Sequence, residues 1–297
     1  MNESPSVQQN EELPVPQNAA ELVQHVGPPS VSNQGSPGST RQTSPKSDPA
    51  PGSPSQASPK SNKKSRRRST TMKKKKKMVA KTNIFEGTYV GDLVENTRHG
   101  HGTLTFENGD YYDGDFKDGF RDGKGYYRCQ NGKYSYTGEY KRSLKHGSGK
   151  EIFPNGDKYV GNFEKDQFSG HGSLWTAAGV YEGNFRDGKK EGTGKFVWYR
   201  GDTYEGKWEN GYMHGKGIYT STDGRIYDGQ FLKGVREGKG NEIYEDGSKY
   251  SGAWVANKKH GQGRYRWPQG RWREGIWNEG KQMRWLTGDR LGGMPSV

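Results

Sequence analysis

Aromatic residues and glycines alternate with a period of two in short segments that recur along the chain from residue 87 onward. In Tyr204–Trp208, a tyrosine is followed two residues later by a glycine and four residues later by a large ring. This alternation is typical of a β-strand, in which every second side chain points to the same face. We expect the tyrosine, glycine and ring to share one face. The intervening residues, which include Asp113, Glu182, Glu205 and Asp228, should face water.

The segment recurs eight times at intervals of 22 to 24 residues, which identifies a tandem array. Each copy ends in a large apolar or aromatic residue, and a Gly-x-Gly pair follows it shortly afterwards. The tyrosines are Tyr89, Tyr112, Tyr136, Tyr159, Tyr181, Tyr204, Tyr227 and Tyr250, and the pairs begin at Gly100, Gly123, Gly147, Gly170, Gly192, Gly215, Gly238 and Gly261.

A second strand is expected after each Gly-x-Gly pair, so that every repeat forms a β-hairpin. Dipeptides that favour tight hairpin turns close several of these strands, and they are Asn108-Gly109, Asn131-Gly132, Asn155-Gly156, Asp223-Gly224 and Asp246-Gly247. Because a single hairpin is marginal in water, stability must come from stacking neighbouring repeats. Glycine normally weakens a strand, but here it would clear space for rings to lie across bare backbone.

The sequence therefore predicts an all-β fold, an elongated single-layer antiparallel β-hairpin solenoid. With about 4.8 Å between strands, each repeat should advance ~10 Å and eight repeats should span ~80 Å. A ninth unit keeps Trp272, Gly275 and Trp277 but lacks the Gly-x-Gly pair, as is usual for the end of an array. We assign residues 83–280 to eight repeats plus this degenerate ninth, and residues 281–297 to a C-terminal cap or tail.

Composition separates the repeats from the first part of the chain. Only 27% of the 297 residues are hydrophobic, 46 are glycine and 12% are aromatic, which favours a thin structure with a core of rings. Residues 1–82 hold 14 Lys or Arg against 5 Asp or Glu, a charge of +9, and the remaining residues hold 33 against 29, a charge of +4. Residues 1–80 contain no aromatic residue and are rich in Ser and Pro, so we predict a disordered tail over residues 1–82.

A basic run from Lys63 to Lys77 contains ten positive charges in fifteen residues. Anionic or phosphoinositide lipid can hold such a run at about 1 kcal/mol per basic residue. The run can also act as a nuclear-import signal or bind polyanions such as nucleic acid or acidic tubulin tails. Nucleic acid is not expected to be the main partner, because no aromatic residue lies within the run for base stacking. The candidate residues are Lys63, Lys64, Arg66, Arg67, Arg68, Lys73, Lys74, Lys75, Lys76 and Lys77.

Five Ser-Pro steps in the tail would suit proline-directed kinases, or else they reflect ordinary linker composition. Ser65, Ser69, Thr70 and Thr71 lie inside the basic run, and phosphorylating them would lower its net charge, so an electrostatic switch is a hypothesis. The candidate phosphosites are Ser44, Ser53, Ser58 and Ser69.

No catalytic, cofactor or metal site is expected, and the chain is not predicted to be an enzyme. Equivalent positions in successive repeats would lie ~10 Å apart, too far for the histidines beside the Gly-x-Gly pairs to share a metal ion. The pairs lack the third glycine and the helix of a dinucleotide-binding loop, and the single cysteine, Cys129, has no partner for a disulfide. The polar start and the absence of a ~18-residue apolar run predict a soluble intracellular protein. The histidines concerned are His99, His101, His146, His171, His214 and His260.

The segments "YVGNFEKDQFSGHG" and "YEGKWENGYMHGKG" closely resemble the MORN repeat (membrane occupation and recognition nexus), whose consensus is Tyr-x-Gly-x-Trp/Phe, a turn and then Gly-x-Gly. The resemblance covers roughly residues 85–280 through eight copies, in which Leu93 and Tyr140 depart from the usual ring. It implies a cytoskeletal setting, because stand-alone arrays of this size are similar to radial-spoke head and other ciliary or flagellar proteins and to scaffolds of the cortical cytoskeleton.

The leading functional prediction is a structural scaffold whose aromatic groove accepts a peptide of a protein partner. Packing between repeats could instead consume the rings. Open sheet edges favour a homodimer. The alternative function is a membrane tether at the cytoplasmic face, in which the basic run binds anionic lipid and the array holds a partner; a nuclear location is a third reading. The candidate groove residues are Tyr159, Phe163, Tyr181, Phe185, Tyr204, Trp208, Tyr227, Phe231, Tyr250 and Trp254.

Overall fold

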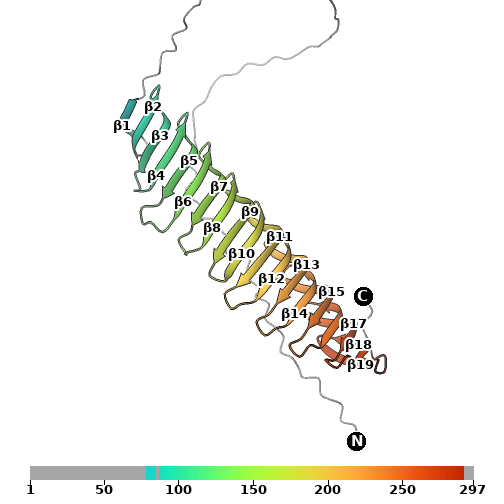
Figure 1. The fold of residues 1–297 in the computed structure, drawn as a ribbon. Coiled ribbons are helices and arrows are strands. Elements are labelled where there is room, and N and C mark those ends of the chain that lie inside the picture. Colours follow the sequence, from blue (N-terminus) through green and yellow to red (C-terminus); the bar gives the residue numbers. More distant parts are fainter. Residues whose placement is uncertain (1–77, 85–86, 291–297) are drawn as a thin grey trace, which may run out of the picture. The chain divides into compact units, whose positions relative to one another are not determined.

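The computed structural model describes residues 78–84 and 87–290, and every regular element within them is a β-strand (Figure 1). Nineteen strands form one antiparallel sheet, in which each strand pairs with its neighbours in the chain. This confirms the predicted all-β hairpin array. The strands are β1 (Met78–Ile84), β2 (Gly87–Val94), β3 (Thr97–Phe106), β4 (Tyr111–Lys117), β5 (Phe120–Arg128), β6 (Ser135–Lys141), β7 (Leu144–Ile152), β8 (Lys158–Glu164), β9 (Gln167–Thr176), β10 (Gly179–Arg186), β11 (Lys189–Trp198), β12 (Thr203–Glu209), β13 (Tyr212–Thr220), β14 (Ile226–Leu232), β15 (Val235–Ile243), β16 (Lys249–Val255), β17 (Lys258–Arg266), β18 (Trp272–Asn278) and β19 (Lys281–Trp285).

The array begins earlier than the predicted boundary. The tail was expected to reach residue 82, whereas β1 begins at Met78 and pairs with β2, with Met78 opposite Leu93. The reason is that β1 supplies the hydrogen-bonding partner that the edge of β2 would otherwise lack. At the other end β19 pairs with β18, and Trp272 forms a bridge to Arg290. Residues 281–290 therefore continue the pairing past the degenerate ninth unit.

Each repeat closes its hairpin with a two-residue turn whose residues both have positive φ, as in a type I′ turn. Between β12 and β13 these residues are Asn210 (φ 50°) and Gly211 (φ 90°). The predicted dipeptides lie instead in the longer connections between hairpins. There, Gly109 has a φ of 82° and donates its amide to the carbonyl of Phe106 at 2.9 Å. The expectation that these dipeptides make the tight turns is wrong, because a single left-handed glycine suits a three-residue loop.

One glycine from each of β2 to β18 joins a continuous row across the sheet, in which each glycine is the register partner of the next. A Cβ on Gly217 would lie 2.4 Å from the ring of Tyr204, so no larger residue fits there. The row consists of Gly91, Gly102, Gly114, Gly125, Gly138, Gly149, Gly161, Gly172, Gly183, Gly194, Gly206, Gly217, Gly229, Gly240, Gly252, Gly263 and Gly275.

The tyrosine of each repeat lies over two glycines of this row. Tyr204 covers Gly206 and Gly217, and its hydroxyl donates to the carbonyl of Lys207 at 2.8 Å. That carbonyl lies where the pairing register shifts, beside the left-handed Gly215 (φ 55°) of the Gly-x-Gly pair. Burial raises the pKa of these tyrosines, to about 12 for Tyr89, so the hydroxyls remain donors. In all eight repeats the tyrosine hydroxyl donates to the carbonyl oxygen of the residue three positions later in the chain. The tyrosines are Tyr89, Tyr112, Tyr136, Tyr159, Tyr181, Tyr204, Tyr227 and Tyr250.

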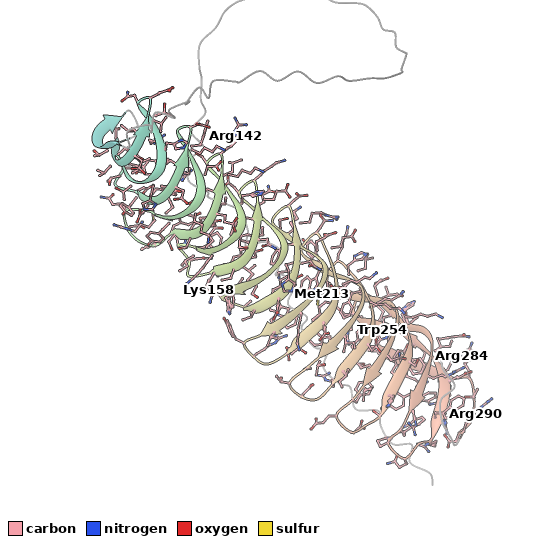
Figure 2. All side chains as sticks on the ribbon, turned by 45° about the horizontal axis from the view of Figure 1, so that its top comes forward. Arg142, Lys158, Met213, Trp254, Arg284 and Arg290 are labelled. Carbon is pink, nitrogen blue, oxygen red and sulfur yellow. The ribbon has the colours of Figure 1, made fainter. Side chains whose placement is uncertain are left out.

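The tyrosines and the large rings form one chain of edge-to-face contacts from Tyr89 to Trp277. Tyr204 contacts Trp208 of its own repeat at 5.3 Å between ring centroids and Phe231 of the next repeat at 5.0 Å. Tyr140 takes the usual ring position without interrupting the chain. Figure 2 labels Trp254, another member. Each contact stabilises by about 0.5 to 1.5 kcal/mol beyond the area it buries, so the core joins every repeat to the next.

We predict that Gly217→Ala lowers the free energy of unfolding by about 2 to 3 kcal/mol, because the new methyl group must displace the Tyr204 ring. Urea unfolding followed by tryptophan fluorescence measures this loss. Gly288→Ala is the control, because a Cβ there meets no atom within 4 Å. An equal effect of the two substitutions would show that the ring does not occupy the glycine row.

Candidate interaction surfaces

The ten aromatic residues predicted to line a partner groove lie in the core of the sheet. Their exposed fractions are at most 4%, and the rings contact one another. This corrects the expectation of an open groove lined by these rings, since a partner could touch them only by displacing their neighbours. The ten are Tyr159, Phe163, Tyr181, Phe185, Tyr204, Trp208, Tyr227, Phe231, Tyr250 and Trp254.

A row of mostly cationic residues lies beside the rings on the same face, at the second residue after each tight turn. Six of its eight members are Lys or Arg, and the Arg236 guanidinium lies 4.4 Å from the ring centroid of Trp254. These cation–π contacts pack the charged groups against the aromatic core. This inner row was not predicted, although it recurs with the same 22- to 24-residue spacing as the tyrosines. Its members are Arg98, Arg121, Lys145, Phe168, Lys190, Met213, Arg236 and Lys259.

Two members of the inner row are paired with buried carboxylates. Glu151 accepts hydrogen bonds from the Lys145 ammonium and the Tyr134 hydroxyl. Glu242 pairs with Arg236 at 2.8 Å and accepts a hydrogen bond from a neighbouring tyrosine hydroxyl. Burial raises the pKa of Tyr134, so its hydroxyl remains a donor. The opposite charges attract one another within the core, which offsets part of the cost of burying them, although Glu151 Oε2 and Arg236 Nε are buried without a hydrogen-bond partner among the described residues.

Lys190 is buried among rings instead. Its side chain is 6% exposed, and its ammonium lies 4.6 Å from the ring centroid of Phe196 and 4.8 Å from that of Trp208. No ion pair among the described residues involves this ammonium. Burial lowers its pKa from 10.5 to about 8. The neighbouring repeats hold Phe168 and Met213 at this position, of which Figure 2 labels Met213, so the site accepts an apolar side chain.

The opposite face of the sheet carries polar, exposed side chains and a hollow of about 610 Å³. The hollow is lined from β13 to β18, with backbone of Gly229, Gly240, Gly252 and Gly263 among its lining. Amide and hydroxyl side chains such as Asn241 lie beside these glycines. This face therefore offers an accessible recess to a partner.

The histidines lie along the sheet without converging on one centre. His101 contacts Asp113 and Asp115 at 3.1 and 3.4 Å, and these three side chains are partly exposed. Within residues 78–84 and 87–290, no group of three or more His, Cys, Asp or Glu residues is placed to hold a metal ion. Cys129 is half-buried against the core. The same part of the chain contains no helix long and apolar enough to cross a membrane.

The predicted polyanion-binding run, Lys63 to Lys77, and the candidate phosphosites lie outside the described residues. Their roles stay predictions from sequence. The phosphosites are Ser44, Ser53, Ser58 and Ser69.

A family model described as the MORN repeat matches eight consecutive segments that together cover more than half of the chain. The chain matches none of the curated proteins with which it was compared. The matched segments are residues 89–111, 112–134, 136–158, 159–179, 181–203, 204–224, 227–249 and 250–271.

Two solved structures show partial similarity. One is the SAS-4 (dCPAP) TCP domain of Drosophila melanogaster in complex with a proline-rich motif of Ana2 (dSTIL), at 14% identity over 44% of this chain and 73% of that chain, with a TM-score of 0.31. The other is the G-box domain of the microcephaly protein CPAP, at 11% identity over 73% of this chain and 100% of that chain, with a TM-score of 0.23. Scores this low establish neither a common fold nor a shared function.

We predict that Lys190→Met stabilises the protein by roughly 2 kcal/mol at pH 7, because it removes an ammonium whose charged form burial disfavours. The folded-state pKa of about 8 lies below the ordinary value of 10.5, so the unfolded state binds more protons between these values. The stability of wild type relative to the variant should therefore rise from pH 8 to 10.5. The comparison with the variant is needed because the buried tyrosines, whose pKa values are raised, lower the stability of both proteins as the pH approaches 10. Urea unfolding across this pH range measures both effects.

Lys145→Met is the matched control, because it makes the same change at a paired member of the inner row. It should destabilise by about 3 kcal/mol, since Glu151 would be left buried without its cation. If Lys190→Met destabilises the protein to a similar extent, the lack of a counter-charge does not determine how Lys190 affects the free energy of unfolding.

Proposed function

Because the chain belongs to the MORN-repeat family, which indicates a protein-interaction or scaffold module, we propose that it is a non-enzymatic scaffold in a cytoskeletal assembly such as a ciliary or flagellar axoneme. The observation that carries this proposal is that the two faces of the sheet differ: one is buried and the other is exposed. Rings fill one face, whereas the other exposes side chains such as Glu205, Asp228 and Lys239. Equivalent exposed positions recur about every 10 Å along the sheet, which suits the ordered placement of partners.

Contacts between repeats support a scaffold that keeps a fixed spacing. Besides the ring contacts, a backbone hydrogen bond joins each tight turn from Asp118-Gly119 onward to the preceding hairpin. The amide of Gly211, for example, donates to the carbonyl of Lys190 at 3.0 Å, and the amide of Gly234 donates to that of Met213 at 2.9 Å. Neighbouring hairpins are thus joined both by ring contacts and by backbone hydrogen bonds. Partners bound to different repeats would therefore stay at defined separations.

A membrane tether is the second candidate function, favoured by the charge density of the run from Lys63 to Lys77. Ten basic residues suffice for electrostatic binding to anionic or phosphoinositide lipid at the cytoplasmic face of a membrane. In this function the array would hold the protein partner. Either function is compatible with a homodimer formed through the edges of the sheet, at β1 or β19.

We predict that the array directs the protein to its assembly. A full-length tagged protein whose ten basic residues from Lys63 to Lys77 are changed to glutamine should keep its location on cilia or the cytoskeleton, because the repeats are intact. Fluorescence microscopy in the native cell type, combined with proximity labelling, measures location and partners together.

The control is a full-length protein in which Gly217 and Gly240 are changed to valine. The new side chains collide with the tyrosine rings that cover these glycines, whereas the basic run is unchanged. This variant should become diffuse and lose its labelled partners. If the glutamine variant becomes diffuse while the valine variant stays on a membrane or in the nucleus, the basic run directs the protein and the scaffold proposal is wrong.

A further inference from the structure

A row of side chains on the outward face changes its charge along the array. The row is formed by the middle residue of each Gly-x-Gly pair and by its register partner on the next strand. In the first repeats this row includes carboxylates, since Asp115 is opposite His101 and Glu139 is opposite Lys124. Near the N-terminal end of the sheet the outer row therefore carries no excess of positive charge.

From β11 to β16 the outer row becomes positive. Lys207 is opposite Thr193, Lys216 is opposite Gln230, and Lys239 is opposite Ala253, so each lysine faces a neutral residue. All three lysines are exposed, and no ion pair within the described residues involves any of them. Lys207 and Lys216 flank the paired glycines Gly206 and Gly217 on the same side of the glycine row. The three form one basic stretch, which we name the lysine row.

The lysine row coincides with the hollow of the outward face. Lys216 and Lys239 line it directly. On the other side of the glycine row, the charged side chains of the outward face are mostly paired. Lys195 lies 3.9 Å from Glu205, and Arg264 lies 2.8 Å from Glu274. Asp228 is a carboxylate of the lining that pairs with none of the lysines in the described structure. The recess and its edge thus carry three unpaired positive charges against this one negative charge.

Resting on the proposed scaffold function, we propose that the hollow from β13 to β18, with the lysine row at its edge, binds an acidic peptide segment of a partner protein. The glycines leave peptide backbone as part of the lining, and Gln230, Asn241 and Gln262 add amide groups that can pair with the backbone of a bound segment. Five steps between strands span about 24 Å, which accommodates about seven residues of extended peptide. A flat bilayer surface could not enter a recess between two rows of side chains.

Binding of a fluorescein-labelled peptide of alternating glutamate and serine to the full-length protein tests this proposal. The test variant is Lys207→Gln, Lys216→Gln and Lys239→Gln together, which keeps side-chain length and removes three charges. We expect about tenfold weaker binding, because each exposed pair contributes modestly and three are lost. The matched control is Lys117→Gln, Lys141→Gln and Lys165→Gln, which removes three exposed charges elsewhere on the sheet and should change affinity less than twofold.

Carbodiimide cross-linking of the same peptide, read by mass spectrometry, locates the site. We expect links to Lys216 and Lys239. Links confined to Lys63–Lys77, equal weakening in the two triple variants, or loss of binding to phosphatidylserine vesicles without loss of peptide binding would each overturn the proposal. A lysine-row variant that keeps its cellular location and its labelled partners while binding the peptide unchanged would overturn this inference and leave the scaffold function standing.

Discussion

The placement of a tyrosine ring over a pair of glycines is the contact on which the rest of the structure depends. The ring can lie against the sheet only because Gly206 and Gly217 have no side chain beneath it. Once it lies there, its hydroxyl reaches the carbonyl of Lys207, and its edges meet Trp208 and Phe231. One arrangement thus satisfies a polar group, covers bare backbone and joins two repeats. Since each tyrosine repeats it, the array needs no second layer to bury its core.

The glycines of one repeat meet three separate physical demands. Gly215 has a φ of 55°, a conformation that favours glycine, and it lies where the register shifts. Gly217 is excluded from carrying a side chain by the tyrosine ring, and Gly206 by that ring and by the backbone of Gly217. A chain with 46 glycines would ordinarily be hard to order, because glycine loses the most conformational freedom on folding. Here each of these three positions is used for a contact or conformation that another residue could not supply.

The pattern of the sequence predicts which side chains share a face, because the side-chain period of a strand is two and the repeat length is nearly constant. It also predicts that glycines make room for rings. It does not predict that the rings are closed to partners, since that depends on how Tyr204 tilts toward Trp208 and on the inner row that packs beside them. Lys190 was missed for a related reason: an isolated lysine is normally exposed, and only the contacts of Phe196 and Trp208 show it to be buried.

The separation of core and surface explains how so regular an array can differ along its length. Packing and backbone conformation fix the tyrosine, the large apolar residue and the three glycines of each repeat, whereas the outward residues point away from the core and are free to vary. Lys124 opposite Glu139 and Lys216 opposite Gln230 occupy equivalent places, yet one pair is balanced in charge and the other is positive. Recognition can therefore change from repeat to repeat without altering the sheet. Specificity in such a protein resides in the order of its outward residues, whereas its stability resides in the residues that repeat.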